Sequence, residues 1–454
     1  MRINITSCFL LLGFMACTSQ KKLAKPAEPM AATSAPAVTA AKTETDIEKA
    51  AGQFLLSDSN LATAHLGISI YDPAEKKYLY NYQGDKYFIP ASNTKLLTCY
   101  AAMKYLGDSL VGLRYEMNED NSSVIDVEFN GDPTFLHPDF KMQPVFDFLK
   151  SKSIISIGEE NWKENELGYG WSWNDYNEDY MAERSLIPLY GNVVSFSADA
   201  ITLPSYFQKN VIGDISQKSF SVKREISANR FIIKPSKRKF TATQIPFHTT
   251  DANFIINLLV DTLKSKISFT HVQMPRWGGA KIIHSQPTDS LLKITMHRSD
   301  NFFAEQTLLM VSNERLGVMS DAAIIDTLLK TDYKAMPQKP KWVDGSGLSR
   351  YNLISPQDFV FVLEKMKNEF AWNRITTILP TGNSGTLAGL YKNYVGKIYA
   401  KTGTVSNNLA LSGYIITNQN KQLIFSVMVN NHQASATAIR KSIEKFITDI
   451  IEKY

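Results

Sequence analysis

The chain lacks most of what a disulfide-stabilised or metal-dependent protein requires. It has three cysteines in 454 residues, and two of them, Cys8 and Cys17, fall within the first seventeen. Cys99 is thus the only cysteine left for the folded body, which excludes an internal disulfide there. The seven histidines show no H-E-x-x-H or similar ligand spacing, so we expect no metal site and no cofactor.

A strong charge and long hydrophobic runs are missing as well. The formal charge of +5 is small for 454 residues and gives no reason to expect a nucleic-acid partner, although it suits an anionic substrate. Beyond residue 17 no stretch approaches 18 uninterrupted apolar residues, so the sequence predicts no transmembrane helix. With 44% hydrophobic and 20% charged residues, the composition is that of a globular protein with a large core.

The N-terminal segment is the exception to this ordinary composition. MRINITSCFLLLGFMAC has a basic Arg2, an apolar run and a small residue before Cys17, which is the layout of an export signal. Its end resembles the lipobox of bacterial lipoproteins, and this resemblance implies that Cys17 is acylated and anchors the chain to a membrane in the periplasm. Ser19 and the lack of an acidic run after it favour the outer membrane. An ordinary cleaved signal or a short anchor is the alternative.

The remaining chain divides into a tether and an α/β body. Residues 18–45 are rich in Ala, Pro, Thr and Lys and predict a disordered tether. Strand patterns occur at 65–72, 78–82, 397–404, 409–417 and 422–431, and helical patterns at 96–106, 290–312 and 439–450. We expect a catalytic domain in two pieces, 46–112 and 286–454, with a strand-rich insert at 113–285.

The pattern S-x-x-K occurs five times, at Ser19, Ser92, Ser236, Ser290 and Ser442. Only Ser92 follows a Pro-Ala pair at the start of a buried helix, where free backbone N–H groups favour a developing oxyanion. Lys95, one turn further on, would be partly desolvated there. Burial lowers the pKa of a lysine, and a neutral amine can take the proton of a serine. Ser92 is therefore the candidate nucleophile.

Two further motifs raise this candidate above the other four. Ser299-Asp300-Asn301 is the only S-D-N in the chain, and Lys401-Thr402-Gly403 is the only K-T-G, on a predicted strand before a hairpin. In the order S-x-x-K, S-D-N, K-T-G, the three motifs resemble those of the penicillin-recognising serine acyl enzymes.

The spacing narrows the resemblance to one branch. Ser299 lies 204 positions after Lys95. This long separation resembles the large insert of the low-molecular-mass class C penicillin-binding proteins, the DacB-type D-alanyl-D-alanine carboxypeptidases and endopeptidases. The segments DGSGLSR at 344–350, GDPT at 131–134 and GWSWND at 170–175 are similar to that family too. Phe129 and Asn130 depart from it, since glycines usually stand there. The resemblance implies a serine β-lactamase/DD-transpeptidase-like catalytic domain, with an antiparallel sheet flanked by helices.

The resemblance also implies a role for each motif residue. Ser92 would attack the carbonyl of the penultimate D-Ala of a peptidoglycan stem peptide, and Lys95 would be the general base. Ser299 would relay a proton to the leaving amine, and Asn301 would hold Lys95 and the substrate. Lys401 would help to keep Lys95 neutral and attract the terminal carboxylate, which Thr402 and Thr404 would hydrogen-bond, with Gly403 between them. The backbone N–H groups of Ser92 and Thr404 would form the oxyanion hole.

Asp175 and Arg350 are candidates for a second subsite. In the family, an acidic residue of the insert and an arginine of the DGSGLSR segment capture the amino-acid end of the stem side chain. An ammonium and a carboxylate there suit an opposite pair of charges. The alternative is that Asp175 caps a turn and Arg350 makes a structural ion pair.

Three functions remain open on the sequence. The first is a periplasmic serine DD-peptidase, either a carboxypeptidase or an endopeptidase, with β-lactams as covalent inhibitors. The second is a β-lactamase, and the third is a non-catalytic lipoprotein that senses penicillin or binds the cell wall. The intact motifs and the long insert favour the first.

Overall fold

The computed structural model describes residues 45–216, 218–237, 240–270 and 279–454, which belong to one compact unit, Glu44–Tyr454. The predicted signal peptide, the lipidated Cys17 and all of the tether except Thr45 lie outside the described residues. No helix in the described ranges is both long and apolar enough to cross a membrane. Thr45 begins the described fold by capping the first helix, since its hydroxyl accepts from the backbone N–H of Glu48.

A five-stranded antiparallel sheet forms the centre of the catalytic part, in the order β14-β15-β16-β1-β2. Both faces of the middle three strands are covered, so near-continuous apolar runs suit them and their residues are almost all buried. β14 is an edge strand, and a bridge between Tyr399 and Thr381 covers only part of its outer side. The strands are β1 (His65–Asp72), β2 (Lys77–Tyr82), β14 (Ile398–Val405), β15 (Asn408–Ile416) and β16 (Gln422–Asn430).

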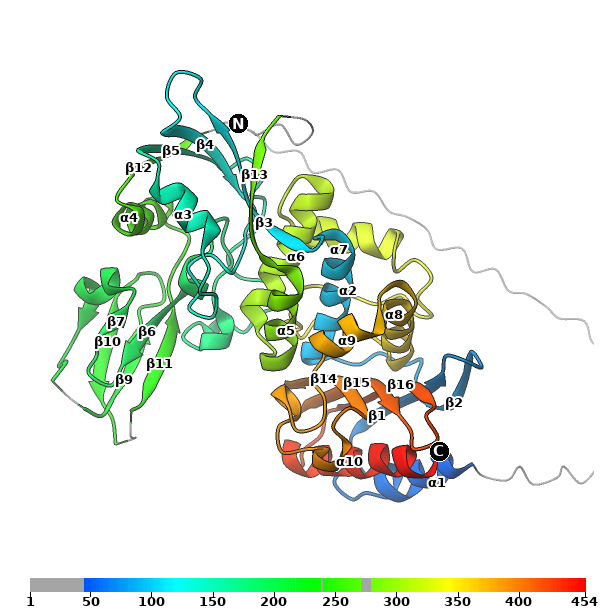
Figure 1. Cartoon of the computed structure of the whole chain (residues 1–454). Coiled ribbons are helices and arrows are strands. Elements are labelled where there is room, and N and C mark those ends of the chain that lie inside the picture. Colours follow the sequence, from blue (N-terminus) through cyan, green and yellow to red (C-terminus); the bar gives the residue numbers. More distant parts are fainter. Residues whose placement is uncertain (1–44, 217, 238–239, 271–278) are drawn as a thin grey trace, which may run out of the picture. The chain divides into compact units, whose positions relative to one another are not determined.

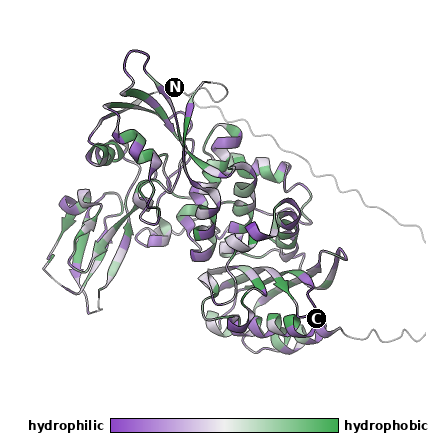
Figure 2. Cartoon of the chain, viewed as in Figure 1, coloured by the Kyte–Doolittle hydropathy of each residue, from purple (hydrophilic) through white to green (hydrophobic). Residues whose placement is uncertain are grey.

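Two helices that are distant in sequence cover one face of this sheet (Figure 1). α1 (Asp46–Ala51), continued by a π-helical turn at Gly52–Leu56, lies against α10 (Ala436–Lys453). Figure 2 shows hydrophobic and hydrophilic residues alternating along α10, as expected for a helix with one side on a core. Its buried stripe includes all five residues that the sequence pattern predicted: Ile439, Ile443, Phe446, Ile447 and Ile450.

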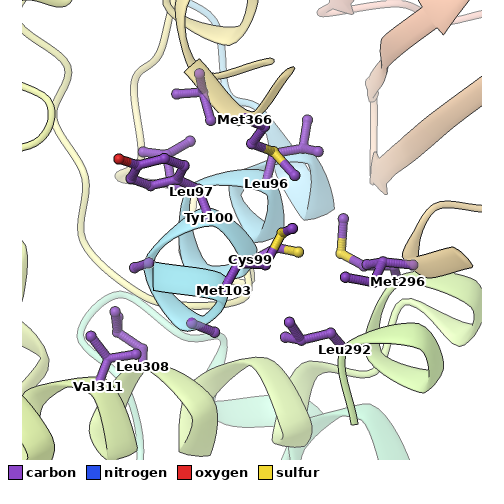
Figure 3. Packing of buried hydrophobic residues seen from close by; sticks show 14 of the residues in the cluster. Leu96, Leu97, Cys99, Tyr100, Met103, Leu292, Met296, Leu308, Val311 and Met366 are labelled. Atoms are coloured by element: carbon purple, nitrogen blue, oxygen red, sulfur yellow. The ribbon is translucent and has the colours of Figure 1, made fainter. Parts of the chain in front are cut away.

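The other face is covered by a helical layer around α2 (Lys95–Tyr105). α2 is buried nearly all round, because α5, α6 and α8 pack against it (Figure 3). Cys99 is free and buried inside this layer. The other helices of the layer are α5 (Thr288–Arg298), α6 (Asn301–Leu316), α7 (Asp321–Lys330), α8 (Pro356–Glu369) and α9 (Trp372–Ile378).

The residues between α2 and α5 build sheets of their own around a separate core (Figure 1). A mixed five-stranded sheet has the order β12-β5-β4-β3-β13, and two three-stranded sheets have the orders β8-β10-β9 and β11-β6-β7. The elements are β3 (Ser109–Met117), β4 (Val124–Phe129), α3 (Pro144–Lys150), β5 (Ile154–Gly158), β6 (Val193–Ser197), β7 (Thr202–Leu203), β8 (Val211–Ile212), β9 (Phe220–Arg224), β10 (Phe231–Pro235), β11 (Ala242–Pro246), α4 (Ala252–Leu263), β12 (Lys266–Thr270) and β13 (Lys281–Pro287).

One predicted element differs from the structure in a way that matters for the site. The helical pattern at 290–312 is interrupted, because Ser299 adopts a left-handed conformation with φ 60° and ends α5. Asp300 then caps α6 by accepting from the backbone N–H of Phe303. Because of this break, Ser299 lies between the two helices and contacts Lys401 on the edge strand β14.

Candidate active site

The nucleophile candidate Ser92 sits on a tight 3₁₀ turn, Ala91–Thr94, that leads into α2. Ala91 has φ 48°, a left-handed conformation that costs an L-residue roughly 1–2 kcal/mol. Hydrogen bonds hold the turn: Thr94 Oγ1 donates to the Ala91 carbonyl at 2.9 Å, and the Asn93 side chain donates to Ser412 Oγ of β15 at 2.7 Å. Ser92 itself stays half-buried at the cleft.

Two glycines let other segments approach this turn closely. A Cβ at Gly347, which has φ 82°, would lie 1.9 Å from the Ala91 carbonyl oxygen. A Cβ at Gly403 would lie 2.5 Å from the Pro90 carbonyl oxygen and 3.2 Å from the Ser92 nitrogen. Glycine is therefore required at both positions, and Gly403 brings β14 beside the backbone of Ser92.

Lys95 is fully buried, and its Nζ has three neighbours. They are Ser92 Oγ at 3.0 Å, Asn301 Oδ1 at 2.6 Å and the Ser346 carbonyl oxygen at 2.8 Å. Amide and carbonyl oxygens only accept hydrogen bonds. A neutral Lys95 would thus direct its two hydrogens at Asn301 and Ser346, and its lone pair would face the hydroxyl of Ser92.

Burial lowers the pKa of Lys95 to about 8, against the opposing effect of nearby carboxylates, of which Glu305 is the strongest. The sequence analysis expected this effect from burial and from the charge of Lys401; in the structure burial is the largest cause, and Lys401 is not among the others. Near neutral pH a usable fraction of Lys95 is unprotonated, as a general base requires.

The S-D-N motif connects the two lysines. Asn301 accepts from Lys95 through Oδ1, and its Nδ2 donates to the Tyr180 carbonyl of the insert at 2.9 Å. Lys401 Nζ donates to Ser299 Oγ at 2.8 Å. Since that hydroxyl oxygen already accepts from Lys401, its own hydrogen is free to point toward the cleft.

Lys401 is as deeply buried as Lys95 and lies on the edge strand β14. Its Nζ also donates to the Thr402 carbonyl at 2.6 Å. Burial lowers the pKa of Lys401 well below its ordinary value, and the charge of Lys95 lowers it further. A carboxylate that binds beside it would raise this pKa again, so Lys401 favours an anionic ligand.

A cleft of about 770 Å³ opens over these groups. Ser92, Ser299, Asn301 and Thr404 line it from the catalytic part, and so do residues of the insert. Asp175 and Arg350 line the same cleft. Arg350 is exposed and donates to the Ser406 carbonyl at 3.2 Å, and among the described residues it makes no ion pair.

Three functional features escaped the sequence analysis. Glu305, four residues after Asn301, is buried behind Lys95 and accepts from the Ser346 N–H at 2.7 Å, and burial raises its pKa to about 8. Asp344 organises the DGSGLSR loop by accepting from the N–H groups of Gly347 and Ser349. The third is Arg440 of α10, which donates to Thr404 Oγ1 at 2.9 Å. An acidic residue one helical turn beyond Asn301 is a signal that could have indicated Glu305, but no motif marks Arg440.

Asn130, which departs from the family pattern together with Phe129, is held by hydrogen bonds of its side chain. The Asn130 side chain donates to the Val111 carbonyl at 2.9 Å and accepts from Asn313 of α6 at 2.6 Å. Gln306 of the same helix donates to the Gly131 carbonyl at 2.8 Å. The GDPT turn is thus fixed to α6 with asparagine in place of glycine.

No group of three or more His, Cys, Asp or Glu side chains suited to a metal ion occurs in the described part of the chain. The groups that the site brings together are a serine nucleophile candidate and two buried lysines. This arrangement can form and break an acyl-serine.

Comparisons with known proteins agree with this geometry. A sequence model of the D-Ala-D-Ala carboxypeptidase 3 (S13) family matches residues 50–450. The chain is 23% identical to the D-alanyl-D-alanine carboxypeptidase DacB of Haemophilus influenzae, over 85% of this chain and 93% of the relative. It is also 23% identical to a D-alanyl-D-alanine carboxypeptidase of an Actinomadura species, over 84% and 80%.

A solved structure supports the fold. The crystal structure of penicillin binding protein 4 (dacB) from Haemophilus influenzae superposes with a TM-score of 0.71 at 18% identity, and covers 90% of this chain and 100% of that one. A predatory endopeptidase from Bdellovibrio bacteriovorus superposes with a TM-score of 0.51 at 15% identity, over 86% and 94%. The expected mixed α/β fold, with an antiparallel sheet flanked by helices, is confirmed.

Proposed function

Because the chain belongs to the D-Ala-D-Ala carboxypeptidase 3 (S13) family, we propose that it hydrolyses the terminal D-Ala-D-Ala bond of peptidoglycan stem peptides through an acyl-enzyme on Ser92. The observation that carries this proposal is the position of Lys95. Its Nζ lies 3.0 Å from Ser92 Oγ, and its two other neighbours can only accept hydrogen bonds.

Acylation follows from these contacts. Ser92 Oγ attacks the carbonyl carbon of the penultimate D-Ala and loses its proton to Lys95. The negative charge that develops on the carbonyl oxygen is stabilised by the backbone N–H groups of Ser92 and Thr404, which Gly403 holds close together.

Collapse of the tetrahedral intermediate breaks the C–N bond and needs a proton for the leaving amine. The proton that Lys95 took from Ser92 would reach this amine by way of the Ser299 hydroxyl, whose hydrogen is left free by its contact with Lys401, so that Lys95 is neutral again. Water then attacks the acyl-serine with Lys95 as base again. The shortened peptide is released, and the hydroxyl of Ser92 is regenerated. No external oxidant, metal or cofactor enters this balance.

Thr404, Asp175 and Arg350 line the cleft, whereas Thr402 lines a separate small cavity; together they offer matching groups for the two ends of the substrate. The terminal carboxylate would bind the Thr402 and Thr404 hydroxyls beside Lys401. Asp175 and Arg350 would capture the ammonium and carboxylate at the end of the stem side chain, and their place on the same cleft supports this. A β-lactam presents a comparable carbonyl and carboxylate, and the Haemophilus protein has been crystallised with such a compound.

A β-lactamase needs a dedicated base that deacylates the serine, and the composition of the cleft disfavours one. Asp175 is the one carboxylate among the described residues that line the cleft, and it lies on the insert. An endopeptidase remains the second candidate, because a Bdellovibrio structure of the same fold carries that name and both reactions acylate the same serine.

A release assay tests the activity. The purified chain is incubated with a pentapeptide ending in D-Ala-D-Ala, with the same peptide ending in L-Ala-L-Ala as control, and free alanine is quantified. We expect D-alanine release by the wild type and none by Ser92→Ala. A parallel assay uses a cross-linked peptide dimer: its cleavage without D-alanine release from the pentapeptide would assign the endopeptidase reaction, and no release in either assay would support a non-catalytic protein.

We also propose that the chain is a periplasmic lipoprotein anchored through Cys17, with the outer membrane as the favoured site. The FMAC sequence and the polar residues after it support this. Membrane fractionation of cells that express the wild type or Cys17→Ala tests it. We expect the wild type in the outer-membrane fraction and the variant in the soluble fraction, whereas equal distributions would contradict the anchor.

A further inference from the structure

A guanidinium group lies behind the K-T-G-T strand. Arg440 occupies the second turn of α10, and its Nη2 donates to Thr404 Oγ1 at 2.9 Å. α10 starts at the cleft, since its first residue, Ala436, lines the wall next to Thr404. The partly buried Arg440 side chain also lines a small cavity together with Thr402, Gly403 and Ile443, so it lies along the strand rather than in open solvent.

Arg440 has no acidic partner within the part of the chain that the structure describes. No described carboxylate lies within 4.0 Å of its guanidinium nitrogens, and Thr404 is its one hydrogen-bond partner among the described residues. By contrast, arginines such as Arg184 and Arg374 pair with carboxylates. A partly buried, unneutralised arginine beside a ligand-binding strand is suited to an anionic ligand.

The hydrogen bond has a direct consequence for Thr404. A threonine hydroxyl has one hydrogen, and its oxygen here accepts from Arg440. The hydroxyl hydrogen is thereby directed away from the guanidinium, and the positive charge makes it a stronger donor. Thr404 lines the cleft, so this hydrogen is available to a bound group.

We propose that Arg440 is a positioning residue for recognition of the substrate's terminal carboxylate, acting through Thr404 and through its own uncompensated charge. The inference rests on the proposed function and extends it. If Arg440 acts in this way, the substrate is selected by the free carboxylate of the leaving amino acid and not by the D-Ala carbonyl alone.

The test compares two substrates with four proteins. The substrates are a peptide ending in D-Ala-D-Ala and the same peptide with its C-terminus as the neutral amide; the proteins are the wild type, Arg440→Ala, Arg440→Lys and Lys441→Ala. Lys441 is the exposed neighbour on the same helix, so its variant controls for the loss of one positive charge from α10. The readouts are kcat and KM for each pair.

We expect Arg440→Ala to lower kcat/KM for the acid roughly tenfold, mainly through KM, and to leave the amide nearly unchanged, as for loss of a charge-assisted hydrogen bond. Arg440→Lys should restore part of the preference, and Lys441→Ala should keep all of it. Two further variants, Thr404→Ala and the double variant Thr404→Ala/Arg440→Ala, complete a mutant cycle, in which the effect of Arg440→Ala on the acid-to-amide ratio should shrink because the two side chains act together.

Equal losses on acid and amide would overturn the proposal and make Arg440 a structural link between α10 and β14. An acid-to-amide ratio that falls as far in Lys441→Ala would overturn it too, since general charge would then explain the preference. These results are distinct from failure of the proposed function, in which the wild type itself would hydrolyse neither substrate.

Discussion

At the scale of single residues, the reactivity of Ser92 depends on a lysine that the fold has made less basic. A lysine in water keeps its proton far above neutral pH and cannot serve as a base. Burial of Lys95 lowers its pKa to about 8, and the hydrogen bonds to Asn301 and Ser346 orient its lone pair at Ser92. Desolvation and geometry therefore act on the same atom.

This account predicts how acylation depends on pH. The rate at which a penicillin acylates Ser92 should rise with pH through an apparent pKa of about 8, because only neutral Lys95 can accept the proton. The Glu305 carboxylate raises the pKa of Lys95, so Glu305→Gln should move the rising limb of the profile to lower pH. Stopped-flow or quenched acylation rates between pH 5 and 10 would measure both.

Glu314→Gln provides the matched control for that experiment. Glu314 lies on the same helix, α6, but pairs with Arg114 of β3, away from Lys95. Its substitution should not change the pH at which the acylation rate rises. A limb that does not move in Glu305→Gln, or that moves equally in both variants, would contradict the effect of Glu305 on Lys95, and a rate that does not rise with pH would contradict the assignment of Lys95 as the base.

The second subsite gives a prediction about selectivity. Asp175→Ala should weaken hydrolysis of peptides that contain meso-diaminopimelate more than hydrolysis of a generic thioester, because only the former carries an ammonium group for Asp175 to bind. Ratios of kcat/KM for the two substrates would measure the effect. Equal losses on both would assign Asp175 to the structure of the turn at Trp173–Asp175.

At the scale of elements, the site depends on how closely the loop at 344–350 and strand β14 approach the Ser92 turn. Gly347→Ala should abolish most acylation, because its Cβ would lie 1.9 Å from the Ala91 carbonyl oxygen and force the turn to move. Gly389→Ala is the control, since Gly389 has a similar φ of 84° with no atom within 4 Å of a Cβ.

Both glycine variants should lose about 1 kcal/mol of unfolding free energy from backbone strain alone. Only Gly347→Ala should also lose acylation and further stability. Thermal unfolding and penicillin-binding rates would separate the two effects. Full activity of Gly347→Ala would show that the close approach does not position Ser92.

The elements also show what the sequence could predict. The strands at 65–72 and 397–404 and the buried helix after Lys95 follow from residue periodicity, and the structure has β1, β14 and α2 there. The break at Ser299 does not follow from it, because apolar residues continue through the motif at helical spacing. A left-handed serine is selected by its contacts with Lys401 and the sheet edge, which are tertiary.

The catalytic motifs were predictable for a different reason than the residues behind them. Ser92, Ser299 and Lys401 belong to short patterns whose order alone identifies them. Glu305 and Arg440 act through partners more than 30 residues away in sequence, Ser346 and Thr404. Such contacts exist only once the helices have packed, so the sequence has no local signal for Arg440, and for Glu305 it has only the position of an acidic residue one helical turn after Asn301.

At the scale of the whole molecule, residues 44–454 form one compact unit, and the family match lies within it. A chain that starts at Thr45, which caps α1, should therefore keep the full-length chain's melting temperature and its rate of acylation by penicillin. Calorimetry and acylation kinetics on both chains would check this. A lower melting temperature or a slower rate would show that residues before Thr45 contribute to the fold or the site.

The most direct test of the central claim, that Ser92 is the acylated nucleophile, is the location of a penicillin adduct by peptide mass spectrometry. The account predicts one stable penicilloyl group, on Ser92 of the wild type, and none in Ser92→Ala, with the other four S-x-x-K serines unmodified. An adduct on another residue, an adduct that persists in Ser92→Ala, or no adduct at all would contradict it.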